Sequence, residues 1–404
     1  MGKKKTKKDL IPIKENLHIK IVATLMIICV FGCLMVFSAS GHMCVQKEMY
    51  NYDSMYMLKK QAIFMLGGFG IILVSLFFNL ALLVEKLTIP IYCAGYISIF
   101  LLLSPLGVTS HGATRWIRFM GMQFQVAEVV KISVIIMLAY MVKKYYKHLV
   151  NPKLTIRMWL AGGIPACLLF FISSDLSSSV VILGIVFGIT FVTNDTLKIH
   201  LSTFTAALVV VGLYVIHISN NLPSPDELRS VSFRVGRIAA WLKPELYASD
   251  QAYQTLNGLY AIGIGKIFGK GIGMSIMKQH IPEAQNDMIF AIIVEELGMV
   301  GGCVLIYLYI YLLYLLMRVI INTENIVEST IVLGIALHIG VQAFFNIAVT
   351  LNVLPNTGIG LPFISYGGTS ILCLMFEMAM ACSIAKKNYV KSVKKEMHRR
   401  YACK

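Results

Sequence analysis

The chain has 404 residues, of which 57% are hydrophobic and 14% are charged, and its formal net charge is +16. This composition excludes an ordinary soluble domain, because so large an apolar fraction is typical of membrane-spanning chains. We therefore expect an all-α polytopic membrane protein.

Basic residues gather at both ends of the chain. Seven lysines lie within residues 1–20, and eight lysines and arginines lie within residues 386–404. Such tails are compatible with nucleic-acid binding, but the tendency of basic residues to stay on the cytoplasmic side of a membrane explains them better. We expect cytoplasmic tails at 1–18 and 386–404, a membrane domain at 19–385, and no nucleic-acid partner.

The apolar runs predict about ten spans, since roughly 20 residues are needed to cross the hydrocarbon layer as a helix. The predicted spans are 19–39, 60–80, 87–104, 126–142, 157–173, 177–194, 201–218, 286–317, 328–352 and 366–385.

One large extracytoplasmic loop, 219–285, separates the seventh span from the eighth. Its alternating apolar and polar runs favour amphipathic or re-entrant segments at the membrane surface. Glycines are frequent between 258 and 273, so we expect a turning backbone there rather than a stable helix.

Four carboxylates mark the start of the eighth predicted span, in the sequence IPEAQNDMIFAIIVEELG at 281–298. They are Glu283, Asp287, Glu295 and Glu296. An acid within a membrane is costly, so each is a candidate functional residue. For Glu283 and Asp287 the alternative is helix capping, because the helix dipole favours negative charge at an N-terminus.

Three further groups carry polar chemistry. Glu128 and Lys131 are three residues apart on one helix face, which suits either an ion pair that stabilises packing or a functional site. Lys266, Lys270 and Lys278 lie among glycines and suit either solvated loop lysines or an anion site. The segment 354–370 is broken by proline and glycine as it enters the last span, and it must line protein or a water-filled cavity.

Four runs together resemble one family. The runs GATRWI…QVAEVVK, AIGIGKIFGKGIG, IPEAQNDMIFAIIVEELG and LPFISYGGTS occur in the order and spacing of the SEDS proteins (shape, elongation, division, sporulation), a family that contains FtsW, RodA and SpoVE. The resemblance covers about residues 18–387. The run Gly271–Ser275 with Lys278 resembles the FtsW and SpoVE branch more than RodA.

The resemblance implies a ten-span peptidoglycan glycosyltransferase that polymerises lipid II, the undecaprenyl-pyrophosphate-linked disaccharide peptide, outside the bacterial cytoplasmic membrane. Asp287 matches the essential acid of the family and is the expected catalytic residue; Glu283 is the expected supporting acid or metal ligand. The residues expected to bind substrate or pyrophosphate are Arg115, Trp116, Lys131 and Lys270. Those expected to shape the cavity are Glu128, Glu295, Glu296, Pro362, Ser365, Gly367 and Gly368.

The resemblance also implies cofactors and partners. A divalent cation, Mg²⁺ or Mn²⁺, held by Asp287 and Glu283 is the candidate cofactor, and no organic cofactor is expected. The expected partners are a class B penicillin-binding protein and other membrane proteins of cell division or elongation.

The sequence departs from the family pattern in places and leaves alternatives open. Gln285-Asn286 replaces the usual His-Thr, Val126 replaces a proline, and Ser174–Ser177 replaces a PDLG-type turn. A lipid II flippase would bind the same ligand, and Glu295 and Glu296 keep that alternative open. A non-catalytic scaffold for a penicillin-binding protein is the third interpretation.

Overall fold

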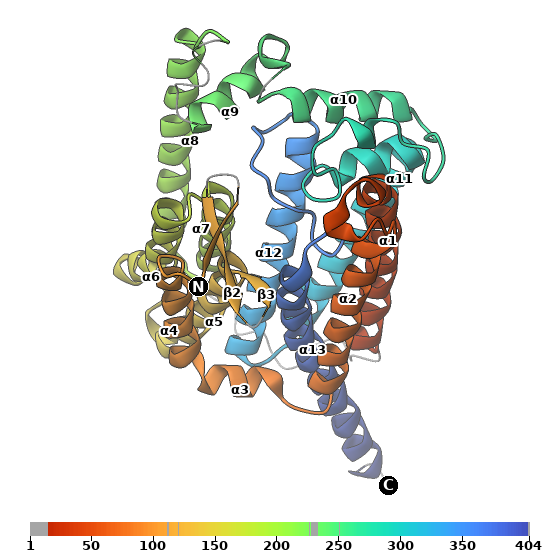
Figure 1. Cartoon of the computed structure of the whole chain (residues 1–404). Coiled ribbons are helices and arrows are strands. Elements are labelled where there is room, and N and C mark those ends of the chain that lie inside the picture. The colour runs from red at the N-terminus through yellow and green to blue at the C-terminus, as the bar shows by residue number, and fades with distance from the viewer. Residues whose placement is uncertain are drawn as a thin grey trace.

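The computed structural model describes residues 15–402, apart from 111–112, 120, 226, 228–232 and 250. Most of the predicted N-terminal tail, and Gly112 of the GATRWI run, lie outside the described residues. The helices form a bundle, with α9 and α10 across one end and the last turns of α13 projecting from the other (Figure 1). The helices are α1 (Leu17–Gln46), α2 (Tyr56–Ser75), α3 (Leu80–Lys86), α4 (Thr88–Leu101), α5 (Val126–Lys144), α6 (Pro152–Ile172), α7 (Leu176–Thr193), α8 (Leu197–Asn220), α9 (Phe233–Leu242), α10 (Tyr253–Gly265), α11 (Ile289–Asn322), α12 (Ile326–Thr350) and α13 (Gly368–Ala402).

Each predicted span coincides with a helix or a bent pair of helices. Among the described residues, eight helices are long and apolar enough to cross a membrane, and α3 with α4 forms a further pair bent by 74°. The predicted fourth span is α5, whose apolar run is interrupted by Glu128 and Lys131. The expectation of a polytopic helical membrane protein is confirmed, while the exact number of spans stays a prediction.

Two hydrophobic clusters hold the bundle together. One joins α1, α2, α11, α12 and α13, and the other joins α4, α5, α6 and α7. Small residues bring helix backbones close, as in other membrane bundles. A Cβ added at Gly162 would lie 2.1 Å from Val186, and one added at Gly334 would lie 2.5 Å from Ile135.

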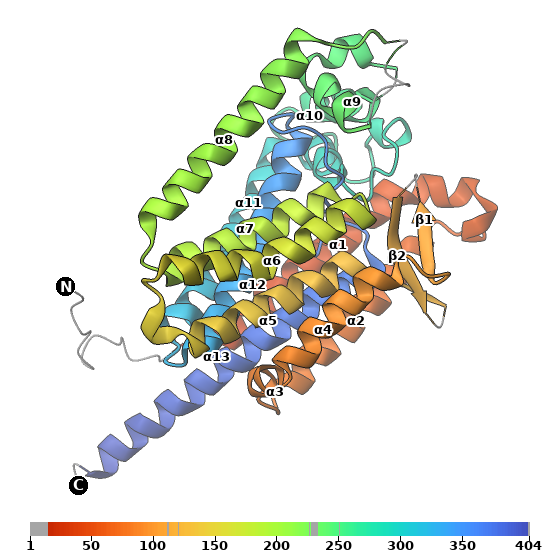
Figure 2. The ribbon, with the colours of Figure 1, turned by 90° about the vertical axis from the view of Figure 1, so that its left-hand side faces the viewer.

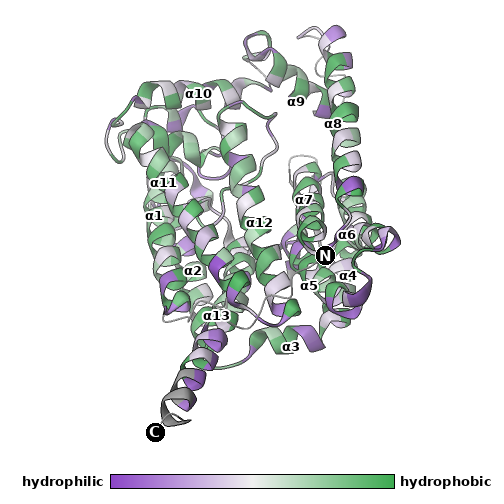
Figure 3. Cartoon of the chain, turned by 180° about the vertical axis from the view of Figure 1, so that it is seen from behind, coloured by the Kyte–Doolittle hydropathy of each residue, from purple (hydrophilic) through white to green (hydrophobic). Residues whose placement is uncertain are grey.

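Helix α8 stands apart from this packing. Of its residues only His200 and Ile218 are buried, and Figure 2 shows the helix leaning away from the bundle towards α9. Its long apolar faces suit contact with lipid, as the hydropathy colouring of Figure 3 shows.

The segment between α4 and α5 folds into a small sheet that the sequence did not lead us to expect. Strands β1 (Gly107–Ser110), β2 (Ala113–Phe119) and β3 (Met122–Gln125) form a three-stranded antiparallel sheet in that order. Trp116 pairs with Val108 on one side and with Gln125 on the other. The all-α expectation is therefore correct for the membrane domain and incomplete for this loop.

The long loop contains α9 and α10, which corrects one expectation. Gly258, Gly263 and Gly265 lie inside α10, although glycine disfavours helices. The reason is close packing: a Cβ added at Gly265 would lie 2.0 Å from the Val294 carbonyl oxygen of α11. The cost of glycine in the helix is offset by this backbone approach.

After α10 the chain lies against a break in α11. The break is at Gly298, which has φ 71° and ψ −174°. The Met299 amide donates to the Lys266 carbonyl at 2.9 Å, and the Lys270 amide donates to the Glu295 carbonyl at 3.0 Å. Only glycine fits at 298, because its φ is positive and an added Cβ would lie 2.2 Å from the Ile267 carbonyl oxygen.

Candidate active site

Asp287 lies in the turn immediately before α11, and it does not cap that helix. The N-cap position is Met288, and no side chain makes a capping hydrogen bond there. The Asp287 Oδ1 instead accepts a hydrogen bond from Gln254 Nε2 of α10 at 3.0 Å. The Asp287 carbonyl accepts from Asn346 Nδ2 of α12 at 2.7 Å. Capping is thus not the role of this acid.

The surroundings of Asp287 make it a better base than an exposed aspartate. Burial raises the pKa of the Asp287 carboxyl to about 6, and the nearby charge of Glu283 acts in the same direction. Arg237 and the hydrogen bond from Gln254 oppose this shift in pKa. A carboxylate that titrates near the working pH is suited to accept a proton during a reaction.

Gln254 links Asp287 to two other segments. Its Nε2 also donates to the Pro282 carbonyl at 3.1 Å, and its Oε1 accepts from Asn356 Nδ2 at 3.0 Å. Gly358, two residues after Asn356, lies near the carboxylate: a Cβ added at Gly358 would lie 3.9 Å from Asp287 Oδ2. The segment 354–368 therefore forms one side of the site.

Of the residues of this segment that the sequence singled out, Ser365 holds the turn 283–287 in place, and the others join the segment to the surrounding helices. Ser365 Oγ donates to the Asn286 carbonyl at 2.5 Å and accepts from the Leu361 amide at 2.6 Å. The Gly367 amide donates to Gln61 Oε1 of α2 at 3.3 Å. The Pro362 carbonyl accepts a bond from the Tyr309 hydroxyl, and Gly368 begins α13.

Arg237 supplies positive charge beside Asp287 and lies near a second arginine, Arg115. Arg115 of β2 donates to the Ser174 carbonyl at 3.1 Å. Arg237 of α9 interacts electrostatically with Arg115, Asp287 and Asp175, and burial together with the charge of Arg115 lowers the pKa of its guanidinium. Asp175 is buried and caps α7 by accepting from the Ser178 amide at 3.0 Å. Asp287 and Asp175 thus form one cluster with Arg237 and Arg115.

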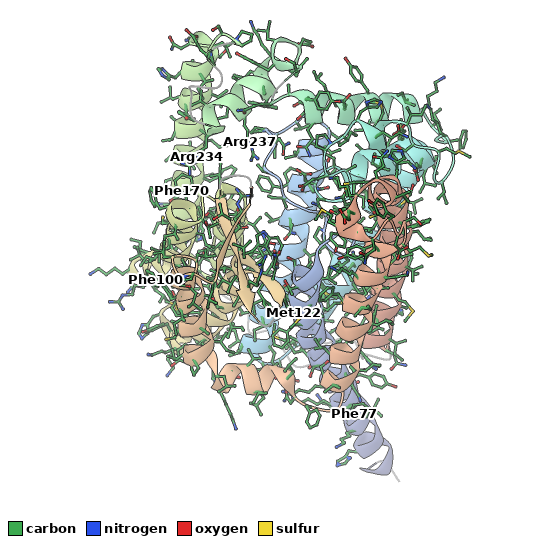
Figure 4. The ribbon with its side chains drawn as sticks, in the orientation of Figure 1. Phe77, Phe100, Met122, Phe170, Arg234 and Arg237 are labelled. Carbon is green, nitrogen blue, oxygen red and sulfur yellow. The ribbon has the colours of Figure 1, made fainter. Side chains whose placement is uncertain are left out.

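Helix α9 is tied to α6 next to this cluster. The Arg234 guanidinium lies 3.9 Å from the centroid of the Phe170 ring. Figure 4 shows Arg234 beside Phe170, and Arg237 further along α9. This stacking holds α9 where it can present Arg237.

Glu283 lies one turn of chain before Asp287. Its carboxylate accepts from Asn286 Nδ2 at 2.8 Å, and its charge contributes to the raised pKa of Asp287. Within the described residues, no group of three or more His, Cys, Asp or Glu side chains is arranged to hold a metal ion. The two acids are close enough in the chain to act together, which leaves the metal interpretation a prediction.

Glu128 and Lys131 lie inside the bundle as an ion pair. Lys131 Nζ is 2.6 Å from Glu128 Oε1 and donates to Gln342 Oε1 of α12 at 3.1 Å. Both residues are buried. The predicted shared face is thus a buried ion pair, and a role of Lys131 in substrate binding stays a prediction.

The other expected residues lie in the sheet and around the break of α11. Trp116 follows Arg115 on β2 and is half-buried. Lys270 lies in the glycine-rich turn against the break of α11. Glu295 and Glu296 are fully buried and hold that turn: Glu295 Oε1 accepts from the Ile276 amide at 2.9 Å, and Glu296 Oε1 accepts from Ser38 Oγ at 2.5 Å.

Comparison with known proteins places this geometry in a family. A family model described as a cell cycle protein, of FtsW, RodA and SpoVE, matches residues 18–390. The chain belongs to the FtsW/RodA/SpoVE family. The resemblance inferred from the four sequence runs is confirmed.

Relatives of this FtsW/RodA/SpoVE-family chain favour the FtsW branch. Proteins named probable peptidoglycan glycosyltransferase FtsW include one from Francisella salina, 31% identical over 95% of this chain and 92% of that protein. Another, from Enterococcus hirae, is 30% identical over 92% of each chain.

Solved structures share the fold. A chain of a peptidoglycan synthase complex, described as coordinating polymerization and crosslinking, is 22% identical and matches with a TM-score of 0.71 over 92% of this chain and 98% of that one. The rod shape determining protein RodA of Thermus thermophilus, also 22% identical, matches with a TM-score of 0.61 over 92% and 97%.

Several residues of the site were missed by the sequence reasoning. Arg237, Gln254 and Asn346 interact with Asp287, and Asn356 contacts Gln254, yet none of the four was expected. A signal existed for Arg237, which lies on an amphipathic run, FRVGRIAAWL. Gln342 and Asn346 share a helix face at a spacing of four, which also marks a polar stripe in an apolar span.

Proposed function

We propose that this family member is a peptidoglycan glycosyltransferase that polymerises lipid II into glycan strands at the outer face of the bacterial cytoplasmic membrane. The observation that carries the proposal is Asp287, a half-buried carboxylate with a pKa of about 6 that lies beside Arg237. The names of the relatives support the reaction class.

The reaction requires a base on one side and cations on the other. Asp287 takes the proton from the acceptor sugar hydroxyl as that oxygen attacks the anomeric carbon of the donor sugar. The bond between that carbon and the pyrophosphate oxygen breaks, and the configuration at the carbon inverts. Pyrophosphate is a good leaving group once its charge is neutralised, so no general acid is required at the leaving oxygen.

Arg115 and Arg237 are the residues suited to neutralise the pyrophosphate. They approach the Asp287 cluster from β2 and α9, and an arginine fork matches phosphate oxygens in geometry. We assign the pyrophosphate to the two arginines because the ammonium of Lys131 is engaged with Glu128 and Gln342 inside the bundle, and substrate binding by Lys131 stays a prediction.

Asp287 and Glu283 would hold a divalent cation if one takes part. Mg²⁺ commonly binds through one or two carboxylates together with substrate phosphates and water, which suits a pair of acids without a third protein ligand. Such an ion would add positive charge at the leaving pyrophosphate.

The flippase alternative loses the observation that supported it. Glu295 and Glu296 bind the turn at 275–277 and Ser38, and Lys278 Nζ lies 3.8 Å from Glu296 Oε1, so both acids have partners within the chain. We also propose that both tails lie in the cytoplasm and that residues 219–285 lie outside.

We further propose that a class B penicillin-binding protein is the partner of this chain. The likeness to a chain of a peptidoglycan synthase complex supports this partner.

Purified protein given lipid II in detergent separates an enzyme from a flippase or a scaffold. Detergent micelles have no leaflets, so only an enzyme changes the substrate. We expect glycan polymer on a gel, made by the protein alone or with its penicillin-binding partner. If the protein moves lipid II across liposome membranes but makes no polymer under any metal or partner condition, it is a flippase and the proposed enzymatic function is wrong.

A further inference from the structure

A polar stripe on α12 connects the middle of the bundle to Asp287. His338, Gln342 and Asn346 are spaced by four residues and therefore share one face of the helix. All three are buried. At one end of the stripe, Asn346 Nδ2 donates to the carbonyls of Asp287 and Ile359, each at 2.7 Å.

Gln342 can be oriented in only one way. Its Oε1 lies 3.1 Å from Lys131 Nζ, which can only donate, and its Nε2 lies 3.1 Å from the Gly360 carbonyl oxygen, which can only accept. The amide oxygen therefore faces His338, whose Nε2 lies 2.9 Å from it. His338 must carry a proton on Nε2.

The other nitrogen of His338 faces a carboxylate. Nδ1 lies 2.9 Å and 3.0 Å from the two oxygens of Glu377 on α13. Two acceptors cannot bond without a proton between them, so one proton must lie between Nδ1 and Glu377 in addition to the proton on Nε2.

Charge balance requires the same proton. The groups that face His338 are Glu377 from α13 and, from α5, Glu128, whose Oε2 lies 3.9 Å from Nε2, and Lys131 behind Gln342. Two carboxylates and one ammonium would leave a net negative charge inside the bundle, where an uncompensated charge is strongly unfavourable. The proton held by His338 and Glu377 makes the cluster neutral.

We propose that His338 and Glu377 hold one buried proton between them and act as positioning residues for Asp287, through Gln342 and Asn346. The proposal rests on the proposed function for its effect on turnover. The protonated pair fixes Gln342, Gln342 holds the carbonyl of Gly360, and Asn346 joins the neighbouring carbonyl of Ile359 to that of Asp287.

Two substitutions at Glu377 distinguish a hydrogen-bond role from simple packing. In Glu377→Gln the new amide donates to Nδ1, so a neutral His338 still donates from Nε2 to Gln342 and no extra proton is needed. In Glu377→Leu, Nδ1 has no partner and the pair is lost. His338→Leu removes the link to Gln342 itself.

The experiment measures polymerisation kinetics and hydrogen exchange on the full-length protein. We expect His338→Leu and Glu377→Leu to lower kcat by on the order of 10- to 100-fold with little change in KM, since small misplacements of a catalytic group have effects of that size. The kcat of Glu377→Gln should be about tenfold higher than the kcat of Glu377→Leu. Amide exchange in 282–288 and 354–368 should rise in both leucine variants and stay near wild type in Glu377→Gln.

His200→Leu is the matched control, because His200 is also a buried histidine of a long apolar helix, α8, but it hydrogen-bonds to Thr190 of α7 and to Thr196, the residue before α8. It should leave kcat and exchange at 354–368 unchanged. Equal effects of Glu377→Gln and Glu377→Leu, or wild-type exchange in His338→Leu, would overturn the proposal. If wild type makes no polymer, the proposed function fails while the exchange measurements still decide the positioning role.

Discussion

Gln254 donates a hydrogen bond to the Asp287 carboxylate at 3.0 Å, so the long loop between α8 and α11 is tied directly to the proposed base. The same side chain accepts from Asn356 and donates to Pro282. One residue of α10 therefore fixes both the base and the segment 354–368 that faces it.

Gln254→Leu should lower activity and shift its pH dependence. The hydrogen bond from Gln254 lowers the pKa of Asp287, so removing it raises that pKa above about 6. The base must be unprotonated, and the acid limb of the pH–rate profile should move to higher pH. An unchanged acid limb would show that Gln254 does not act on Asp287.

Glu283→Gln should shift the acid limb in the opposite direction. The charge of Glu283 raises the pKa of Asp287, so its loss lowers that pKa towards the ordinary value for aspartate. As a supporting acid, Glu283 should affect kcat mildly. A loss as severe as that of an Asp287 variant, reversed in part by raised Mg²⁺ or Mn²⁺, would instead assign the two acids to a shared metal.

Arg237→Ala should lower kcat by on the order of 100-fold, the usual effect of removing one charge-stabilising group from a transition state. Its loss should also raise the pKa of Asp287, because Arg237 opposes the effect of burial. Lys243→Ala is the matched control, because Lys243 is an exposed cation immediately after the same helix. Equal losses in both variants would contradict a specific role for the Arg237 charge.

The orientation in the membrane is tested by labelling. Ser249 is exposed in the long loop, and a single cysteine placed there should react with an impermeant thiol reagent in intact cells. A cysteine at Lys395, in the last turns of α13, should react only after the cells are opened. The reverse pattern would invert the proposed topology.

The membrane helices could be predicted from local composition, whereas the catalytic role expected of Asp287 came from the resemblance to the SEDS family. An apolar run of span length is a helix wherever it lies, and an acid at the edge of such a run is costly unless it has a purpose. The sheet at 107–125 was not foreseen, since its short strands carry only weak periodicity. The helical state of Gly258 and Gly265 depends on contact with α11, which no local propensity contains.

The partners of the site were the hardest to foresee. Gln254, Asn346 and Arg237 come from three different helices, and only the tertiary fold brings them to Asp287. The surroundings of Lys131 were not foreseen for the same reason: its spacing from Glu128 indicated a shared face, but not that Gln342 would complete its hydrogen bonds inside the bundle.

The account depends most on Asp287, and one variant tests it directly. Asp287→Asn keeps the shape of the side chain and removes its charge and basicity. The pKa of Asp287 is raised in the folded state, so its contribution to stability is complete below the unfolded pKa and is lost as pH rises through about 6.

At pH 7 the neutral asparagine should therefore leave the protein at least as thermally stable as wild type. The decisive measurement is the initial rate of polymer formation from lipid II by Asp287→Asn and wild type, with lipid II binding measured on the same samples. We predict no detectable polymer from the variant, with binding and melting temperature retained. Polymer formation at a near-normal rate by a folded Asp287→Asn protein would contradict the assignment of Asp287 as the base.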